Sequence, residues 1–304
     1  MPGTPTARLL DGRALAERMR AAMAPEVERL AAAGRKPRLC VVQVGSHEAA
    51  QSYVRGQQRG AERWGIDLTV HPVAPEGGER AVRKALRQLN EDESVTGILL
   101  ALPLPPDMNA RALQHAIEPR KDVEGVHPEN LGGCLYGRYG LLPCTALASL
   151  ALVQESGISL RGKDAVVVGH SEIVGKPVAL LLLAQDASVS VCHKFTHDLA
   201  SRTRQADVLV VAVGKAGLVT QDMVKPGAVV IDVGINAIAD ASASGGVRIV
   251  GDVDPGVAAV ASAFTPVPGG VGPVTVAMLM RNAILAARGL PPPDDAGQLP
   301  LFHL

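Results

Sequence analysis

Short apolar runs alternate with segments of helical periodicity along this chain, and this alternation constrains its fold more than any other feature. Runs such as 39–44 and 164–168 are rich in valine, as buried strands are, and each is followed by a segment with a helical pattern. Strands that alternate with helices in this way form βαβ units, in which the strands run parallel. The pattern therefore predicts an α/β fold.

The same pattern locates the individual elements. Strands are expected at 39–44, 68–70, 96–102, 164–168, 188–192, 208–213 and 229–233. Helices are expected at 49–64, 80–90, 110–117, 145–155, from the turn after Val168 to Leu183, and at 274–287. The strand at 96–102 ends where three prolines follow, because proline cannot donate a ladder hydrogen bond. Residues 121–128 are expected to form a loop.

A chain of 304 residues suits two α/β domains, each with a sizeable core. Gly157 and Gly162 mark the expected junction. We expect a substrate domain over 1–150 and a Rossmann-type nucleotide-binding domain over 151–273, followed by a final helix within 274–289. Residues 290–304 have the composition of a flexible tail.

The composition agrees with this architecture and excludes some classes of partner. Hydrophobic residues make up 47% of the chain and aromatic residues only 2%, so the cores are built from Ala, Val, Leu and Ile, as in parallel sheets covered by helices. Lys+Arg and Asp+Glu balance at 30 each. This balance argues against binding to nucleic acid or to a charged membrane surface.

Cysteine usage and the absence of targeting patterns indicate a cytoplasmic protein. The cysteines show neither C-x-x-C spacing nor clustering with histidine, which predicts buried free thiols rather than metal ligands or disulfides: Cys40, Cys134, Cys144 and Cys192. The amino terminus lacks the apolar core of a signal peptide, and no apolar run is long enough to cross a bilayer. We expect no bound metal and no membrane contact.

The segment from Val166 to Pro177 reads as a strand, a tight turn and a helix. Gly169 and Gly175 allow the backbone of such a turn to approach a pyrophosphate held at the helix amino terminus. Because any strand-to-helix turn can use glycine, the motif alone is weaker than G-x-G-x-x-G. Its position at the start of a βαβ series favours a dinucleotide site.

The end of the next strand bears on the choice of cofactor. An NAD site places Asp or Glu there, about 20 residues after the turn, to bind the ribose 2′-hydroxyl. Here the strand ends in Cys192-His193-Lys194, with a cation and no carboxylate. Lys194, together with His170, is suited to bind a 2′-phosphate. The alternative is that Lys194 is an ordinary surface lysine exposed to solvent, because the sequence would be the same. The pattern favours NADP over NAD.

Several further segments carry a resemblance to one family. They are the segment from Val44 to Arg59 with Tyr53, Leu102-Pro103-Leu104-Pro105, Lys121-Asp122-Val123, Pro143-Cys144-Thr145, Gly214 and Gly234-Ile235 at two strand ends, and the Pro/Gly-rich string from Thr265 to Thr275. Together they resemble the methylenetetrahydrofolate dehydrogenase/cyclohydrolase (FolD) family over about residues 9–289. The last string alone matches at too many consecutive positions to be chance.

The resemblance implies an NADP-dependent enzyme of one-carbon folate metabolism. It places the cofactor at Gly169, His170, Ser171, Ile173, Val174, Gly175, Lys194, Gly214, Gly234, Ile235 and Thr275. It places a folate-like substrate at Tyr53, Leu102, Pro103, Glu124, Pro268, Gly269 and Gly270. It also implies that the helix at 274–289 returns to the first domain and that two copies form a homodimer through the nucleotide-binding domain.

The match fails at the one-carbon site. The family carries a lysine four residues after Tyr53, one helical turn along the same face, and this chain has Gln57. By resemblance, that lysine supports the attack of water on methenyltetrahydrofolate, a glutamine tunes it, and an aspartate anchors the pterin. This chain has Ala101 and Glu124 in the last two places. The expected catalytic positions are therefore Tyr53, Gln57, Ala101 and Glu124.

These substitutions separate the two reactions of the family. Cyclohydrolysis needs a group that exchanges a proton near the working pH, and a glutamine cannot titrate. Hydride transfer needs mainly orientation, because the cofactor supplies the chemistry. The sequence therefore predicts a dehydrogenase with weak or lost cyclohydrolase activity. Two alternatives stay open, namely a fully bifunctional enzyme with another proton carrier, for which His115 and His127 are weak candidates, and a non-catalytic NADP-binding paralogue.

The tail contains one motif outside this scheme. Residues from Gln298 to Phe302 resemble the short peptide by which bacterial replication proteins bind the sliding clamp. Such motifs also arise by chance in disordered tails.

Overall fold

The computed structural model describes residues 7–45, 48–137, 140–240, 242 and 246–289, with the backbone alone for 48–53. These residues form two compact units. One consists of Arg18–Cys144 and Val276–Leu304 and is called here the three-stranded unit; the other consists of Met1–Glu17 and Thr145–Thr275 and is called the six-stranded unit. The expected tail, including the motif from Gln298 to Phe302, lies outside the described residues.

This division differs from the predicted boundaries at the amino terminus. All residues before 150 were expected in the first domain, but residues 7–17 belong to the six-stranded unit because β1 (Arg8–Leu9) pairs in parallel with β11 (Ala263–Phe264). A strand of two residues carries no periodicity, so the sequence gives no signal for it. From Val276 onward, the last helix belongs to the three-stranded unit.

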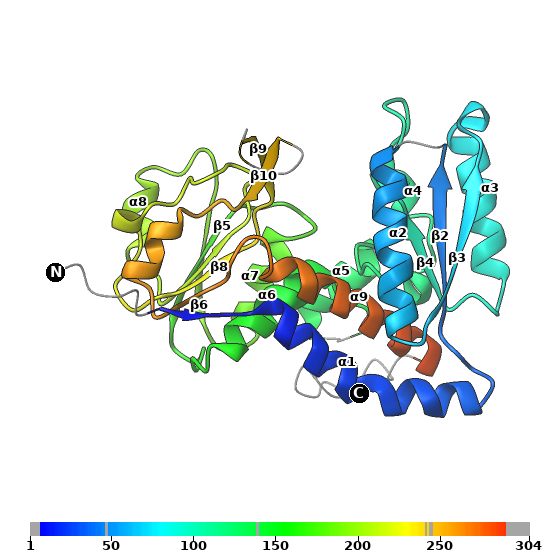
Figure 1. Cartoon of the computed structure of the whole chain (residues 1–304), viewed down its shortest axis with the longest axis horizontal. Helices are drawn as coiled ribbons and strands as arrows, with labels where there is room; N and C mark the ends of the chain where they lie inside the picture. Colours follow the sequence, from blue (N-terminus) through cyan, green and yellow to red (C-terminus); the bar gives the residue numbers. More distant parts are fainter. Residues whose placement is uncertain (1–6, 46–47, 138–139, 241, 243–245, 290–304) are drawn as a thin grey trace. The chain divides into compact units, whose positions relative to one another are not determined.

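The three-stranded unit contains a parallel sheet in the order β3-β2-β4, shown at the right of Figure 1. The strands are β2 (Arg38–Val44), β3 (Asp67–Val73) and β4 (Gly97–Leu100). Its helices are α2 (Glu48–Arg63), α3 (Gly78–Glu91), α4 (Ala110–Gln114), α5 (Pro128–Tyr136) and most of α1 (Gly12–Ala32) and α9 (Val271–Arg288). The third strand ends before the prolines, as predicted, although two residues earlier.

Helix α3 illustrates why these segments fold as they do. Its buried residues are Val82, Ala85, Leu86 and Leu89, which share one face at helical spacing. This face packs with Val42 and Leu100 of the sheet in one continuous core that contains no aromatic side chain. Mainly aliphatic side chains therefore fill this side of the sheet, as the composition predicts.

The six-stranded unit holds a parallel sheet in the order β1-β11-β8-β7-β5-β6. Its other strands are β5 (Asp164–Val168), β6 (Ser188–Cys192), β7 (Val208–Val211) and β8 (Val229–Asp232), and its helices include α6 (Cys144–Glu155), α7 (Gly175–Leu183) and α8 (Leu199–Thr203). Central strands β5, β7 and β8 are almost fully buried. The predicted α/β class with a parallel sheet is confirmed.

A hairpin of β9 (Asn236–Ala239) and β10 (Val247–Val250) follows β8 in this unit. It is antiparallel and lies outside the main sheet. The sequence analysis did not predict it, because Ala and Ser dominate the segment and give no clear alternation. The hairpin brings the segment 251–253 back to the ends of β7 and β8, where it shapes the site described below.

Candidate functional site

The parallel topology collects four strand ends at one edge of the six-stranded sheet. Strands β6, β5, β7 and β8 are neighbours in that order, so their carboxyl ends lie side by side. The loops after them carry most of the predicted cofactor residues: Gly169, His170, Ser171, Ile173, Val174 and Gly175 after β5, Lys194 after β6, Gly214 after β7, and Gly234 and Ile235 after β8. Thr275 is set in the first turns of α9, where its hydroxyl donates to the Val271 carbonyl.

The turn between β5 and α7 is built around its two glycines. Gly169 has a φ of 118°, and a Cβ atom there would overlap the carbonyl of Ala212. A Cβ atom on Gly175 would overlap the carbonyl of Gly169. Between them His170 and Ser171 are exposed, and the Ser171 hydroxyl accepts a hydrogen bond from the Gly175 amide at 3.3 Å. The result is an open turn at a helix amino terminus, a geometry that suits a phosphate group.

The two residues predicted to meet a 2′-phosphate lie at neighbouring strand ends. The ring of His170 lies 4.9 Å from the ring of His193, the residue that precedes Lys194. The Lys194 ammonium lies 4.8 Å from the ring centroid of Phe195, an exposed aromatic side chain. His193 was not predicted as a site residue, because only the ring contact across two strands distinguishes it from a surface histidine. The group forms an exposed, basic and aromatic patch.

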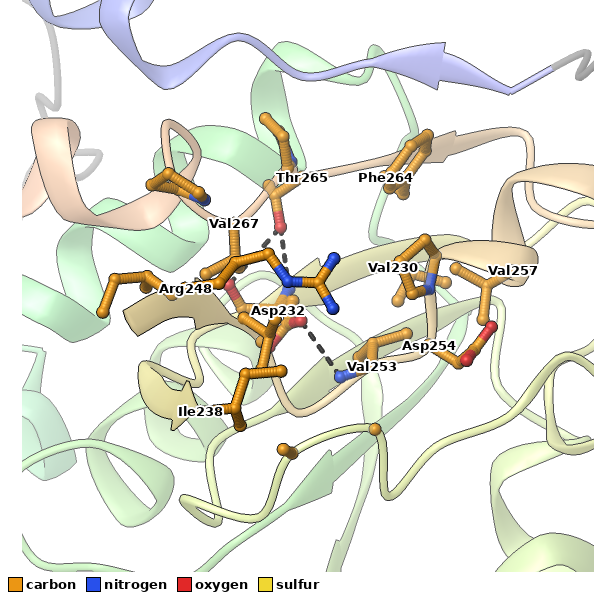
Figure 2. Close-up of a pocket in the computed structure, with 18 residues that line it drawn as sticks. Val230, Asp232, Ile238, Arg248, Val253, Asp254, Val257, Phe264, Thr265 and Val267 are labelled. Atoms are coloured by element: carbon orange, nitrogen blue, oxygen red, sulfur yellow. Dashed lines mark hydrogen bonds between the residues drawn. The ribbon is translucent and has the colours of Figure 1, made fainter. Parts of the chain in front are cut away.

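A pocket of about 560 Å³ lies in the same unit, between β8, β11 and the hairpin (Figure 2). Apolar side chains such as Val230, Val257 and Phe264 line it. Its charged groups are Arg248, Asp232 and Asp254. Burial raises the pKa of Asp232 to about 6. Of the predicted site residues, only Pro268 lines this pocket.

The Pro/Gly-rich loop before α9 is held against the start of α1. The Gly12 amide donates to the carbonyl of Gly269 at 3.0 Å, and a Cβ atom on Gly12 would overlap the carbonyl of Gly270. Gly269 has a φ of 112°, which favours glycine. The predicted substrate residues Pro268, Gly269 and Gly270 thus belong to the six-stranded unit, whereas the other predicted substrate residues belong to the three-stranded unit.

In the three-stranded unit, Gln57 lies on the buried face of α2. It shares this face with Val54 and Ala61, and only 6% of the residue is exposed. Among the residues that the structure describes, its Oε1 atom has no hydrogen-bond partner. A buried amide oxygen without a donor costs about 1–3 kcal/mol. The side chain of Tyr53, one turn earlier, lies outside the described residues.

Ala101 directly follows β4 and is almost completely buried. Its amide donates to the Val42 carbonyl at 2.9 Å, which continues the ladder with β2 for one more residue. Leu102 and Pro103 come next, exposed and joined by a cis peptide bond. The side chain at this position is a buried methyl group, which offers no polar atom to a neighbour.

Glu124 lies alongside the end of β4, because a parallel bridge joins Ile98 to Asp122. Burial and the charge of Asp122 raise the pKa of Glu124 to about 7, against the opposing effect of a 3.4 Å hydrogen bond from Gln114. The structure thus brings Ala101 and Glu124 to the same strand end. No hydrogen bond joins either of them to Gln57 within the described part of the chain.

Asp122 has a structural role in the loop that leads to α5. Its carboxylate accepts hydrogen bonds from the amides of Gly125 and His127 and from the side chain of Asn130. His127 is the N-cap residue that precedes α5, and its Nδ1 accepts from the Glu129 amide at 3.1 Å. This capping bond gives His127 a structural role and does not favour it as a replacement base.

Asn282 of α9 is a buried residue that the sequence analysis missed. Its amide nitrogen donates to the carbonyls of Val123 and Leu142, both at 2.9 Å, and lies 3.4 Å from the Cys144 sulfur. Burial raises the pKa of the Cys144 thiol and lowers that of the neighbouring Arg281 to about 10. These contacts fix the segments on either side of Glu124. The available signal was the pair Arg281-Asn282 in the middle of a mostly apolar helix.

Two structural features bear on the expected absences. Within the ranges that the structure describes, no three His, Cys, Asp or Glu side chains come together as a set of metal ligands. None of the helices in those ranges combines the length and the apolar character that crossing a bilayer requires.

Comparisons with known proteins agree on one family. A model described as tetrahydrofolate dehydrogenase/cyclohydrolase, catalytic domain, matches residues 10–124, and one described as the NAD(P)-binding domain of the same enzymes matches residues 143–290. A protein of Rhodobacter capsulatus named bifunctional protein FolD is 47% identical over 282 residues, which cover 92% of this chain and 93% of the relative.

Solved structures show the same relationship. The bifunctional enzyme FolD of Campylobacter jejuni has a TM-score of 0.88 and 42% identity, covering 93% of this chain and 99% of that one. The dehydrogenase-cyclohydrolase of Trypanosoma brucei, solved in complex with NADP and an inhibitor, has a TM-score of 0.87 and 38% identity, covering 94% and 98%. This chain therefore belongs to the tetrahydrofolate dehydrogenase/cyclohydrolase family.

Proposed function

We propose that this enzyme is an NADP-dependent methylenetetrahydrofolate dehydrogenase whose methenyltetrahydrofolate cyclohydrolase activity is weak or lost. The observation that carries the second half of the proposal is Gln57, a buried amide on the inner face of α2 whose Oε1 lacks a hydrogen-bond donor. A side chain that cannot titrate cannot exchange a proton with water during hydrolysis. The unpaired oxygen makes this position polar, but the amide group can neither take up nor release a proton near neutral pH.

The dehydrogenase half of the proposal needs less from these residues. NADP, when bound, supplies the hydride chemistry, and the chain has to bind and orient the two reactants. The open turn at Gly169 and Gly175 fits a dinucleotide, since a Cβ atom at either position would fill space that the backbone needs. Gln57 is neutral and is therefore compatible with the cationic methenyl product. Ala101 adds no polar group to this environment.

A fully bifunctional enzyme is the second candidate, and two observations favour it. Relatives such as the Rhodobacter capsulatus and Campylobacter jejuni proteins carry the word bifunctional in their names. In this chain, the pKa of Glu124 is raised to about 7, which is where a general acid or base works well at neutral pH. In this second scheme Glu124 exchanges the proton that Gln57 cannot.

The assignment of individual residues is also a proposal. The cofactor residues are those named above at the ends of β5, β6, β7 and β8, together with Thr275. The substrate residues are Tyr53, Leu102, Pro103, Glu124, Pro268, Gly269 and Gly270. The domain limits 1–150 and 151–273 are proposed for the functional halves, with residues 1–17 contributing to the second half through β1.

Assembly and location complete the proposal. We infer a homodimer through the six-stranded unit, which is supported by the edge position of β6 and by the exposed Val191 on that strand. We also propose that the protein is cytoplasmic. Sedimentation at micromolar concentration tests the dimer, and a monomer at all concentrations would exclude it.

A pair of assays on the purified protein tests the function. Methylenetetrahydrofolate with NADP measures the dehydrogenase, and methenyltetrahydrofolate without NADP measures the cyclohydrolase above the rate in buffer. We expect turnover in the first assay and little in the second. Comparable turnover in both supports the bifunctional candidate. Tight NADP binding without turnover in either supports a non-catalytic binding protein.

A further inference from the structure

A buried aspartate holds the loop that follows β7. Asp252 lies just after β10 and is completely buried. Its Oδ2 accepts hydrogen bonds from the amides of Val213 and Gly214 at 2.7 and 2.9 Å, and its Oδ1 accepts from the Lys215 amide at 2.8 Å. The side chain of Asn236 donates to the same Oδ1 at 2.8 Å. One carboxylate therefore accepts four hydrogen bonds, three from the loop after β7 and one from the first residue of β9.

The three amides that Asp252 holds are consecutive. Successive backbone N–H groups that point at one centre form a concavity of the kind that binds anions in many proteins. Here the anion is a side chain of the protein itself, and no ion pair of Asp252 occurs among the described residues. Residues 213–215 are exposed, so the loop is held from beneath while its outer surface stays open to solvent.

A second carboxylate fixes the first. Asp232, the last residue of β8, accepts from the amides of Asp252, Val253 and Gly234, each at 3.0 Å. The hydroxyl of Thr265 in turn accepts from the Asp232 amide at 2.8 Å; Figure 2 shows Asp232 between Thr265 and Val253. A continuous series of hydrogen bonds therefore runs from β8 through Asp232 and Asp252 to the β7 loop.

The two glycines beside this arrangement have no room for a side chain. A Cβ atom on Gly251 would overlap the Asp232 carboxylate, and one on Gly234 would overlap the Asp252 carboxylate. The carboxylates therefore pack directly against backbone, and their positions are fixed by contact as well as by hydrogen bonds.

We propose that Asp252 is a positioning residue that sets the cofactor-binding conformation of the β7 loop (213–215) and of the turn after β8. This inference rests on the proposed function, in which Gly214, Gly234 and Ile235 bind NADP at these two strand ends. Asp252 does not itself touch the cofactor. It acts by holding three amides and Asn236 in one arrangement, so that the exposed side of both loops is already ordered before NADP binds.

The decisive variant is Asp252→Asn, which keeps the shape of the side chain. Each carboxylate oxygen of Asp252 accepts two hydrogen bonds in the wild type. In either orientation of the asparagine amide, an NH2 group takes the place of one of these oxygens and faces two N–H donors. The matched control is Asp254→Asn. Asp254 is exposed two residues away, and its carboxylate accepts only from the Gly256 amide at 2.7 Å among the described contacts.

Two measurements separate this inference from the proposed function. Hydrogen exchange at the amides of 213–215 reports the loop directly and needs no cofactor. Titration calorimetry with NADP reports the binding constant. We expect Asp252→Asn to speed exchange at these three amides by at least about 10-fold and to raise the Kd for NADP by about 10-fold or more, with Asp254→Asn unchanged in both.

A double variant distinguishes the loss of a specific hydrogen bond from general misfolding. Asn236→Asp alone places two carboxylates at hydrogen-bond distance and should also weaken NADP binding. The double variant Asp252→Asn with Asn236→Asp exchanges the amide and the carboxylate, which restores a donor–acceptor pair. It should recover part of the affinity lost in each single variant.

The possible failures are distinguishable. If the wild-type protein does not bind NADP, the proposed function is wrong, and the exchange rates still report whether Asp252 holds the loop. If NADP binds to folded Asp252→Asn with the wild-type Kd, the positioning role is overturned while the proposed function stands. No recovery of affinity in the double variant would likewise contradict it.

Discussion

The Nζ atom of Lys121 lies 2.8 Å from the carbonyl oxygen of Leu89, in the last turn of α3. The same ammonium group donates to the carbonyls of Asn90 and Asp92 at 2.8 and 2.7 Å. The last carbonyls of a helix have no partner within the helix, so this buried cation closes the end of α3. It also anchors the segment that leads to Glu124.

Replacing Lys121 should therefore destabilise the protein. Lys121→Met keeps the length of the side chain but leaves three carbonyls without their donor, and we expect a loss of about 2–3 kcal/mol in the free energy of unfolding. Urea denaturation followed by circular dichroism measures it. Lys84→Met, on the exposed face of the same helix, should cost less than about 0.5 kcal/mol. Equal losses in the two variants would contradict the capping role.

Gln57→Leu should stabilise the fold. The leucine removes a buried oxygen that has no donor and replaces it with an apolar group of similar size, so we expect a gain of about 1 kcal/mol in the free energy of unfolding. Gln58→Leu, at the next and exposed position, is the control and should change stability little. A loss of stability in Gln57→Leu would mean that the amide has a partner, such as bound water.

Gln57→Lys should restore part of the cyclohydrolase activity. Burial would depress the pKa of an introduced lysine, which makes proton exchange near neutral pH feasible. Ala101 and Glu124 still differ from the family pattern, so we expect partial rescue, measured as hydrolysis of methenyltetrahydrofolate. A variant that binds NADP normally but hydrolyses no faster than the wild type would show that Gln57 is not what limits this reaction.

Glu124 should make stability depend on pH. Its pKa is about 7 in the folded protein against 4.5 as the ordinary value, so the folded state binds the proton more tightly. This contribution is present in full below pH 4.5 and is lost as the pH rises through 7. Relative to Glu124→Gln, the wild-type free energy of unfolding should fall by up to about 3 kcal/mol between pH 4.5 and 8.

Denaturant unfolding at several pH values measures this difference. The titration of Asp232 is common to both proteins and cancels from the comparison. Parallel pH profiles for the wild type and Glu124→Gln would exclude a raised pKa at this position. In the dehydrogenase assay, the same variant shows whether a neutral group at position 124 still supports turnover.

Lys194 and His170 should determine the preference for NADP. Lys194→Ala removes a charge-assisted hydrogen bond to a 2′-phosphate, and we expect the Kd for NADP to rise about 10-fold while the Kd for NAD stays constant. His170→Ala should act in the same direction. Lys163→Ala, just before the start of β5 at the opposite end of the strand, is the control. An equal loss for NADP and NAD would point to a general effect on the site.

The sequence analysis predicted the architecture because the pattern of the central strands is local. Strands such as β5 and β7 are short valine-rich runs, and the prolines after β4 end it in a way that local chemistry explains. The pairing of β1 and the hairpin β9–β10 were not predictable. A two-residue strand and a segment rich in small residues acquire their conformation from their partners alone.

The candidate site divides in the same way. The tight turn at Gly169 and Gly175 was predicted because a missing Cβ is visible in the sequence, and the structure has no room for a Cβ atom at either position. Asp252, Asn282 and His193 were missed, because their importance comes from contacts with residues 37 to 159 positions away or from a neighbouring strand end. Nothing in the local sequence distinguishes a buried aspartate that holds a loop from a surface one.

The sequence by itself determined the family, the parallel α/β class and the chemical identity of the unusual position, because each of these depends on residue type and short-range order. A glutamine cannot titrate in any environment. Only the tertiary structure decided that Gln57 is buried with an oxygen that has no donor among the described residues, that burial raises the pKa of Glu124 to about 7, and that Asp252 accepts hydrogen bonds from the loop after β7. Burial and hydrogen-bond partners are properties of packing, and packing brings together residues that are distant in the chain.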